Sequence, residues 1–265
     1  MADNFAHQPN LVLKTFVLAR YLQDVERKRL SEDQQLLVDA AVRGLGSPVL
    51  LNLAGTTTAR AVLEAMITHS DNTATDLAML TVGAQRIRAL IAEAGLQTIR
   101  IPDSTRILAS YLLGAPAGAD FGWPGILRAA KHPPGPLRPP LNNVITLAGT
   151  ARDFVSWYEQ ALRGDFFSRA ATLVEFKRIQ AMSAQIVETI PAETPAYAKG
   201  GEVADFNGLS AKSFAGQMVV AGARPVTFCF IVNWHGPGSE FPAIQREFFA
   251  SIKAILTIVK RALQP

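Results

Sequence analysis

The chain has 265 residues, of which 49% are hydrophobic and 18% are charged, and its formal net charge is +4. This length allows one large domain or two intertwined lobes, and this balance of residues excludes an intrinsically disordered protein. The positive charge is scattered apart from a modest cluster at Lys253, Lys260 and Arg261. No aromatic residues are interleaved in that cluster, so it is interpreted as a solvated helix face, and no nucleic-acid partner is expected.

The apolar stretch from Leu11 to Ala19 is too short to cross a membrane and contains Lys14. Residues 1–10 lack the basic start of a signal peptide, so the chain as written is expected to be cytoplasmic, with no membrane partner. The single cysteine, Cys229, lies in an apolar run, which predicts a buried structural thiol and no internal disulfide. No metal or other cofactor is expected.

The first two thirds of the chain have mainly the apolar period of helices, and the last third begins with the period of strands. Helices are expected at 11–28, 59–69, 73–80, 84–93, 151–162 and 169–182. The stretch 102–141 is rich in Pro and Gly and is predicted to be a long surface loop with one short helix at 107–113. Strands are expected at 196–202, 211–220 and 225–234, before a final helix at 241–262.

This order of elements predicts a single α+β domain over residues 1–265. In it, a helical lobe (about 11–190) packs on a small antiparallel sheet with its C-terminal helix (about 191–265).

Three polar features interrupt these patterns. Lys14 lies in an otherwise apolar helix, where burial would lower its pKa and suit it to be a general base, unless it reaches out from a wet edge. Ser70-Asp71-Asn72 precedes a predicted helix and by itself is typical of an N-cap. Lys199-Gly200-Gly201 begins a predicted strand, where glycines either let a ligand approach closely or form an ordinary strand-edge turn.

In this order, the three features resemble the S-x-x-K, S-D-N and K-T-G motifs of class A β-lactamases and penicillin-binding proteins. The stretch from Gly149 to Asp153 also resembles the T-P-R-D helix start of that family, so the resemblance covers nearly the whole chain. It implies a β-lactamase/transpeptidase-like fold and acyl transfer on a small-molecule amide or β-lactam. Members of this family are usually periplasmic or secreted.

The resemblance also implies roles for single residues. Lys14 would help remove the proton of a serine nucleophile, Ser70 would relay a proton to the leaving nitrogen, and Asn72 would hold the substrate amide. Lys199, with its neighbours Gly200 and Gly201, would bind the substrate carboxylate, and the strand edge would supply part of the oxyanion hole.

The usual nucleophile and the usual deacylating glutamate are not found in this sequence. The serine should stand three residues before Lys14, and that position is Leu11, which has no nucleophilic atom. The family's loop glutamate has no counterpart either, because the chain has no glutamate between Glu93 and Glu159. The polar candidates in that region, none a convincing match, are Asp103, Asp120, Asn142 and Asn143.

Two further departures concern the strands. Glu202 stands where a small hydroxyl residue is expected after the K-T-G motif, and a free negative charge there would repel a substrate carboxylate. Strands that precede the S-x-x-K helix in the family are expected to be missing here, which would leave one sheet edge open and make a homodimer possible. The missing strands and the missing serine would lie next to each other in the sequence, which suggests that a single change in the gene removed both.

Three functions therefore compete. The first is a family hydrolase with impaired activity, in which Ser70 is the plausible substitute nucleophile. The second is a non-catalytic protein that binds a peptide or small amide on the same fold. The third is a truncated, degenerate homologue without function.

Overall fold

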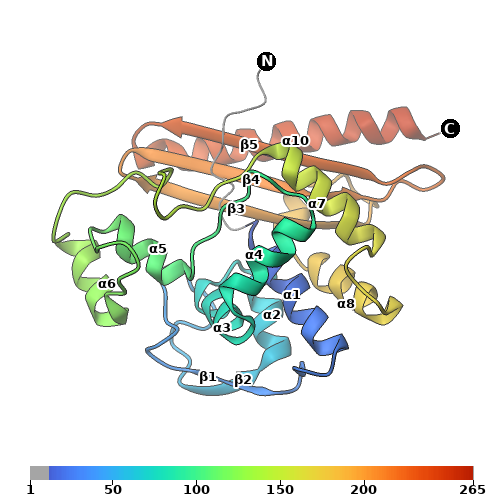
Figure 1. The fold of residues 1–265 in the computed structure, drawn as a ribbon. Coiled ribbons are helices and arrows are strands. Elements are labelled where there is room, and N and C mark those ends of the chain that lie inside the picture. The colour runs from blue at the N-terminus through green and yellow to red at the C-terminus, as the bar shows by residue number, and fades with distance from the viewer. Residues whose placement is uncertain (1–11, 265) are drawn as a thin grey trace.

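A computed structural model describes residues 12–264 and has a helical part packed against an antiparallel sheet (Figure 1). The position of Leu11 lies outside the described residues. The helices of the first part are α1 (Lys14–Glu26), α2 (Ala59–Thr68), α3 (Asn72–Val82), α4 (Ala84–Glu93), α5 (Thr105–Leu112), α6 (Gly122–Lys131), α7 (Ala151–Arg163), α8 (Ala170–Gln180) and α9 (Ile186–Thr189). The sheet strands are β3 (Ala196–Phe206), β4 (Leu209–Met218) and β5 (Val226–His235), and α10 (Phe241–Leu263) follows them.

The sheet has the strand order β3-β4-β5, with both pairs antiparallel. One face is covered by α10, where Ile252 and Leu256 pack in one apolar cluster with Phe214 of β4. The helices α7 and α8 contact the same sheet. The expected α+β architecture, a helical lobe on a small antiparallel sheet, is confirmed.

The strand β5 forms an edge of this sheet, because within residues 12–264 no strand pairs with its outer side. The open edge agrees with the expectation from the sequence. A homodimer through it stays a prediction.

The helix α1 lies at the centre of the helical part and is buried along nearly its whole length. Phe16 contacts Trp157 of α7 with ring centroids 4.5 Å apart, and the Trp157 indole donates a hydrogen bond of 3.0 Å to Thr15 Oγ1. A helix with apolar residues on every side is stable only when neighbours cover all of them, and α2, α3, α4 and α8 supply that cover. The start of α1, where Lys14 lies, is thereby held inside the protein.

The sequence-based expectation for 102–141 was wrong in one respect, because this stretch contains α6 as well as the expected short helix α5. Gly122, Pro124 and Gly125 stand in the first turn of α6 and make it look like a turn in the sequence. Proline is tolerated there because the first N–H groups of a helix have no partner inside the helix.

A hairpin of β1 (Gln35–Val38) and β2 (Gly55–Thr58) and the short α9 were not expected either. Among the described residues, no helix combines the length and apolar character needed to span a bilayer.

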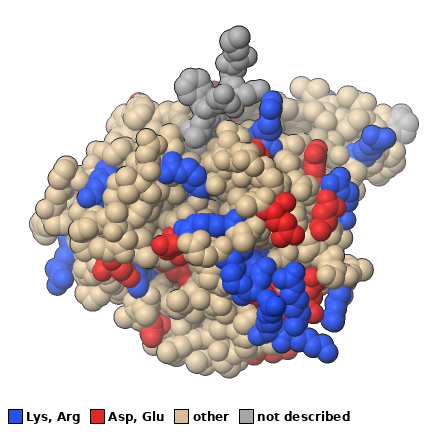
Figure 2. Space-filling model, in the orientation of Figure 1, with Lys and Arg blue, Asp and Glu red and all other residues tan. Residues whose placement is uncertain are grey.

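Charged side chains of both signs share the surface of the face seen in Figure 2. Lys and Arg gather mainly toward one side of that face, with acidic side chains among them (Figure 2). Ion pairs also occur among the charged side chains of the helices, as in the bonds from Arg178 to Glu64 and Glu175.

Candidate active site

Lys14 is fully buried at the start of α1 and does not reach out to solvent. Its ammonium nitrogen donates hydrogen bonds to the carbonyl oxygen of Ser70 and, at 2.9 Å, to Asn72 Oδ1. Burial is the main cause that lowers the pKa of Lys14 well below its usual value, and the nearby positive charge of Lys199 lowers it further. A buried amine of this kind can act as a base near neutral pH.

The turn between α2 and α3 places Ser70 between two lysines. Its backbone has a φ of 57°, in the left-handed region, and its carbonyl oxygen accepts the hydrogen bond from Lys14. Its hydroxyl oxygen accepts a hydrogen bond of 2.9 Å from the ammonium group of Lys199. The backbone carbonyl and the hydroxyl group of Ser70 therefore each accept a hydrogen bond from one of the two buried lysines.

Asp71 caps α3 and also holds the segment that faces it. One carboxylate oxygen accepts the N–H of Ala74 at 2.8 Å, as an N-cap does. The other oxygen accepts the N–H groups of Val49 and Leu50, both at 2.8 Å. The N-cap expected from the sequence is present, and the same side chain holds the backbone at Val49 and Leu50.

Asn72 has one hydrogen-bond donor left for a ligand. Its Oδ1 accepts from Lys14, and its Nδ2 donates to the carbonyl oxygen of Leu45 at 2.8 Å. A side-chain amide carries two N–H groups, so the second remains available. Asn72 also lines the hollow beside it, where a carbonyl group could accept that hydrogen bond.

Lys199 is fully buried on β3 and lies behind Ser70. Its ammonium group also donates to the carbonyl oxygen of Gly200. Burial lowers its pKa to about 7, with the carboxylate of Glu202 acting in the opposite direction. Hydrogen bonds thus link Lys14, Asn72, Ser70 and Lys199 into one cluster, although they come from α1, β3, the turn before α3 and the first residue of α3.

The two glycines after Lys199 have different surroundings. A Cβ atom on Gly200 would lie 2.6 Å from Oε1 of Gln185, so a side chain at this position would displace the end of that glutamine. Gly201 lines the hollow next to Ser70. Of the pair, Gly201 is therefore placed to face a ligand.

Glu202 is paired rather than free. Its carboxylate accepts a hydrogen bond of 2.6 Å from Lys212, which also donates to Gln245 Oε1 of α10 at 2.7 Å. Lys212 lies over the ring of Phe249, 4.5 Å from its centroid. Because Lys212 balances its charge, Glu202 repels a substrate carboxylate less than an isolated glutamate would.

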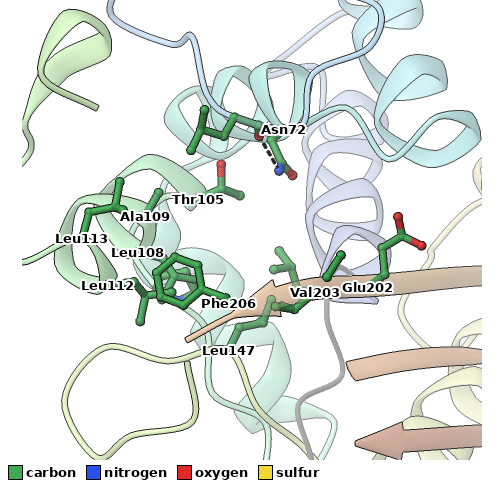
Figure 3. Close-up of a pocket in the computed structure, with 15 residues that line it drawn as sticks. Asn72, Thr105, Leu108, Ala109, Leu112, Leu113, Leu147, Glu202, Val203 and Phe206 are labelled. Atoms are coloured by element: carbon green, nitrogen blue, oxygen red, sulfur yellow. Dashed lines mark hydrogen bonds between the residues drawn. The ribbon is translucent and has the colours of Figure 1, made fainter. Parts of the chain in front are cut away.

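The hollow at this cluster has two parts. A polar part of about 350 Å³ is lined by side chains that include His69, Ser70 and Gln185. An apolar part of about 370 Å³ also borders Asn72, and its lining includes leucines from several segments, among them Leu108 and Leu112 of α5, together with Phe206 (Figure 3). The residues common to both linings are Gly46, Asn72, Glu202 and Ala204.

The apolar part, and His69 and Gln185 in the lining of the polar part, were not expected from the sequence. The available signal was the apolar run from Ile107 to Leu113, which is unusual in a segment interpreted as a surface loop.

Three of the four loop residues considered as substitutes for the missing glutamate have partners elsewhere. Asp103 pairs with Arg88 at 2.7 Å, and Asp120 pairs with Arg106. Asn142 Oδ1 accepts a backbone N–H at 2.8 Å within its own turn. None of these three lines either part of the hollow. Among residues 12–264, no group of three or more His, Cys, Asp or Glu residues could hold a metal ion.

Comparisons with known proteins identify the family of the chain and the fold that it shares with solved structures. The model of the family described as "Beta-lactamase enzyme family" matches residues 4–210. The β-lactamase of Sphaerobacter thermophilus is similar in structure, with a TM-score of 0.73 at 14% identity over 100% of this chain and 87% of that one. The chromosome-encoded β-lactamase of Vibrio parahaemolyticus has a TM-score of 0.71 at 16% identity, over 98% of this chain and 88% of that one.

A structure named PBP-A, solved for a single-residue mutant as an acyl-enzyme complex with penicillin G, has a TM-score of 0.69 at 14% identity. It is covered over 84% of its length, by 98% of this chain. No curated protein matches the chain in sequence. The expected β-lactamase/transpeptidase-like fold is confirmed.

Proposed function

Since the chain belongs to the β-lactamase enzyme family, we propose that it binds a β-lactam or related carboxylate-bearing amide at the Lys14–Ser70–Asn72–Lys199 cluster, and that acyl transfer there is impaired. The observation that carries the proposal is the convergence of these four residues by hydrogen bonds, with Leu11 three residues before Lys14. The serine of the S-x-x-K motif is expected at the position of Leu11, and leucine has no atom that can attack a carbonyl.

Each residue of the cluster has a part in binding. The free N–H of Asn72 donates to the carbonyl oxygen of the ligand amide. The hydroxyl of Ser70 lines the polar hollow, and the positive charge of Lys199 behind it attracts the ligand carboxylate. Gly201 offers a strand edge without a side chain next to the same hollow.

Restoring the serine tests this proposal. The Leu11→Ser variant is expected to form a covalent adduct with a chromogenic cephalosporin, visible as a mass increase of the intact protein, because Lys14 is already a buried base three residues away. The unaltered chain and the matched Leu11→Ala variant are expected to remain without adduct. Hydrolysis by the unaltered chain as fast as by Leu11→Ser contradicts the impairment, and absence of an adduct in Leu11→Ser contradicts the assignment of Lys14.

Acyl transfer by Ser70 itself is a second candidate function. The contact of 2.9 Å between Lys199 and Ser70 Oγ supports it, because an amine with a pKa of about 7 is partly neutral at neutral pH and can then accept the hydroxyl proton. Peptide mapping of protein incubated with a β-lactam tests it. A modified Ser70 peptide that disappears in Ser70→Ala supports this function, and an unmodified peptide refutes it.

A further inference from the structure

The edge strand β5 lacks the features that usually prevent an edge from pairing with another strand. From Val226 to Trp234 it has no charged residue and no proline, and its register with β4 is regular along all ten residues of the strand. Natural edge strands are commonly interrupted by lysine, proline or a bulge, because an uninterrupted edge binds other strands. Within residues 12–264, no strand pairs with the outer side of β5. This edge is therefore suited to bind a further strand.

The helix α10 has an exposed apolar side next to this edge. Ile255 and Ile258 of α10 are 46% and 66% exposed. On another side of the helix, Lys260 donates to the carbonyl oxygen of Ala192 at 2.8 Å, and Lys253 lines a groove with residues of α9. Two residues along a helix turn by about 200°, so the two isoleucines point away from α9. Since α9 precedes β3 at the opposite edge of the sheet, they lie on the side of β5 (Figure 1).

Two exposed charges of opposite sign stand at the two ends of β5. Arg224 precedes the strand by two residues. Glu240 lies beyond the other end, where its carboxylate covers Gly236 so closely that a Cβ atom there would be 2.5 Å from Oε2. Within the part of the chain that the structure describes, neither charge has an ion-pair partner. A strand of ten residues is about 33 Å long, so the two charges of one copy cannot meet.

We propose that β5 pairs with β5 of a second copy of this chain, antiparallel about a two-fold axis. With Val226 opposite His235 of the second copy, Arg224 of each copy comes within reach of Glu240 of the other. The uncharged strand between these ends places no like charges opposite each other. The same axis brings the two α10 helices side by side on one face of the joined sheet, where their exposed isoleucines cover one another. A second copy fits because this surface is complementary to itself in charge.

Sedimentation equilibrium of the full chain over a range of concentrations tests this interface. The unaltered protein is expected to form a dimer in equilibrium with the monomer. Ile258→Lys is expected to raise the dimer Kd at least about tenfold, because it places a charge in the apolar contact. Val187→Lys is the matched control, since Val187 is 81% exposed on α9, and its Kd is expected to be unchanged. A monomer at every concentration up to the solubility limit overturns the proposal, and so does equal dimerisation of the two variants.

Exchanging the two end charges tests the arrangement of the copies. Arg224→Glu and Glu240→Arg are each expected to raise Kd about fivefold at low ionic strength, and the double variant is expected to restore it. Both side chains are exposed and far apart in one copy, so restoration can arise only from contacts between copies. Hydrogen exchange of the β5 amides is expected to slow as the concentration rises. A double variant that stays weak, or exchange that does not depend on concentration, overturns pairing through this edge.

Discussion

Replacing Asp71 by Asn is expected to lower the free energy of unfolding by about 3 kcal/mol. The carboxylate is fully buried and accepts three backbone N–H groups, those of Ala74, Val49 and Leu50, each at 2.8 Å. The amide of Asn has one acceptor oxygen, so its nitrogen, a donor, must face at least one of these N–H groups. Each buried donor left without a partner costs about 1–3 kcal/mol, and the remaining bonds lose the strength that the negative charge gives them.

Urea denaturation followed by circular dichroism measures this loss, with an unchanged dependence on urea showing that both proteins unfold to the same extent. Asp39→Asn is the control, because Asp39 is exposed and accepts a single backbone N–H, that of Ala41, at 2.7 Å. The control is expected to change stability by less than about 0.5 kcal/mol. If Asp71→Asn is no less stable than Asp39→Asn, the reasoning from the three hydrogen bonds is refuted.

Three further predictions concern ionisable groups. Burial raises the pKa of Asp76 from 3.8 to about 6, so the folded state binds the proton more tightly. The protonated group stabilises the fold in acid, and this contribution, up to about 3 kcal/mol, is lost as the pH rises from about 4 to 6. In the Asp76→Asn variant, the midpoint of urea denaturation is expected to change less with pH over this range. Binding of a penicillin carboxylate, measured by calorimetry between pH 6 and 8.5, is expected to weaken above about pH 7, where Lys199 loses its charge, and a flat profile contradicts this. Burial raises the pKa of Cys229 to about 12, so its thiol is expected to react with a disulfide reagent in urea and not in the native protein; rapid native reaction refutes this.

The parts of the fold that the sequence predicted are those with strong local patterns. The range predicted for α4, 84–93, agrees at both ends because Gly83 and Gly95, both with positive φ, interrupt the helical pattern on either side. Thr150 and Asp153 marked the start of α7 because their N-cap hydrogen bond lies within three residues. The start of α6 was missed because its glycines and proline match a turn as well as a first helical turn.

The motif residues of the candidate site could be picked out from the sequence, and their contacts could not. Lys14 and Lys199 were recognisable as unusual lysines, yet the position of Lys199 behind Ser70 depends on how β3 packs against the turn before α3. The partner of Glu202 is Lys212, which is ten residues away and faces it because of the register of β3 and β4. Such pairs become visible only when the strand register is known, since a shift by one residue turns every side chain to the other face.

The helix α3 joins the two parts of the hollow through its hydrogen bonds. Asn72 in its first turn lines both parts, and Asp76, four residues later, holds α5 through the N–H groups of Thr105 and Arg106. Every residue except proline has such an N–H, so the anchor does not depend on which side chains α5 presents to the cavity. Substitutions at Leu108, Ala109 or Leu112 therefore change the lining of the apolar part, while the contact between α3 and the start of α5 stays in place. The shape of the hollow can thus vary by single changes on one short helix without loss of its anchor.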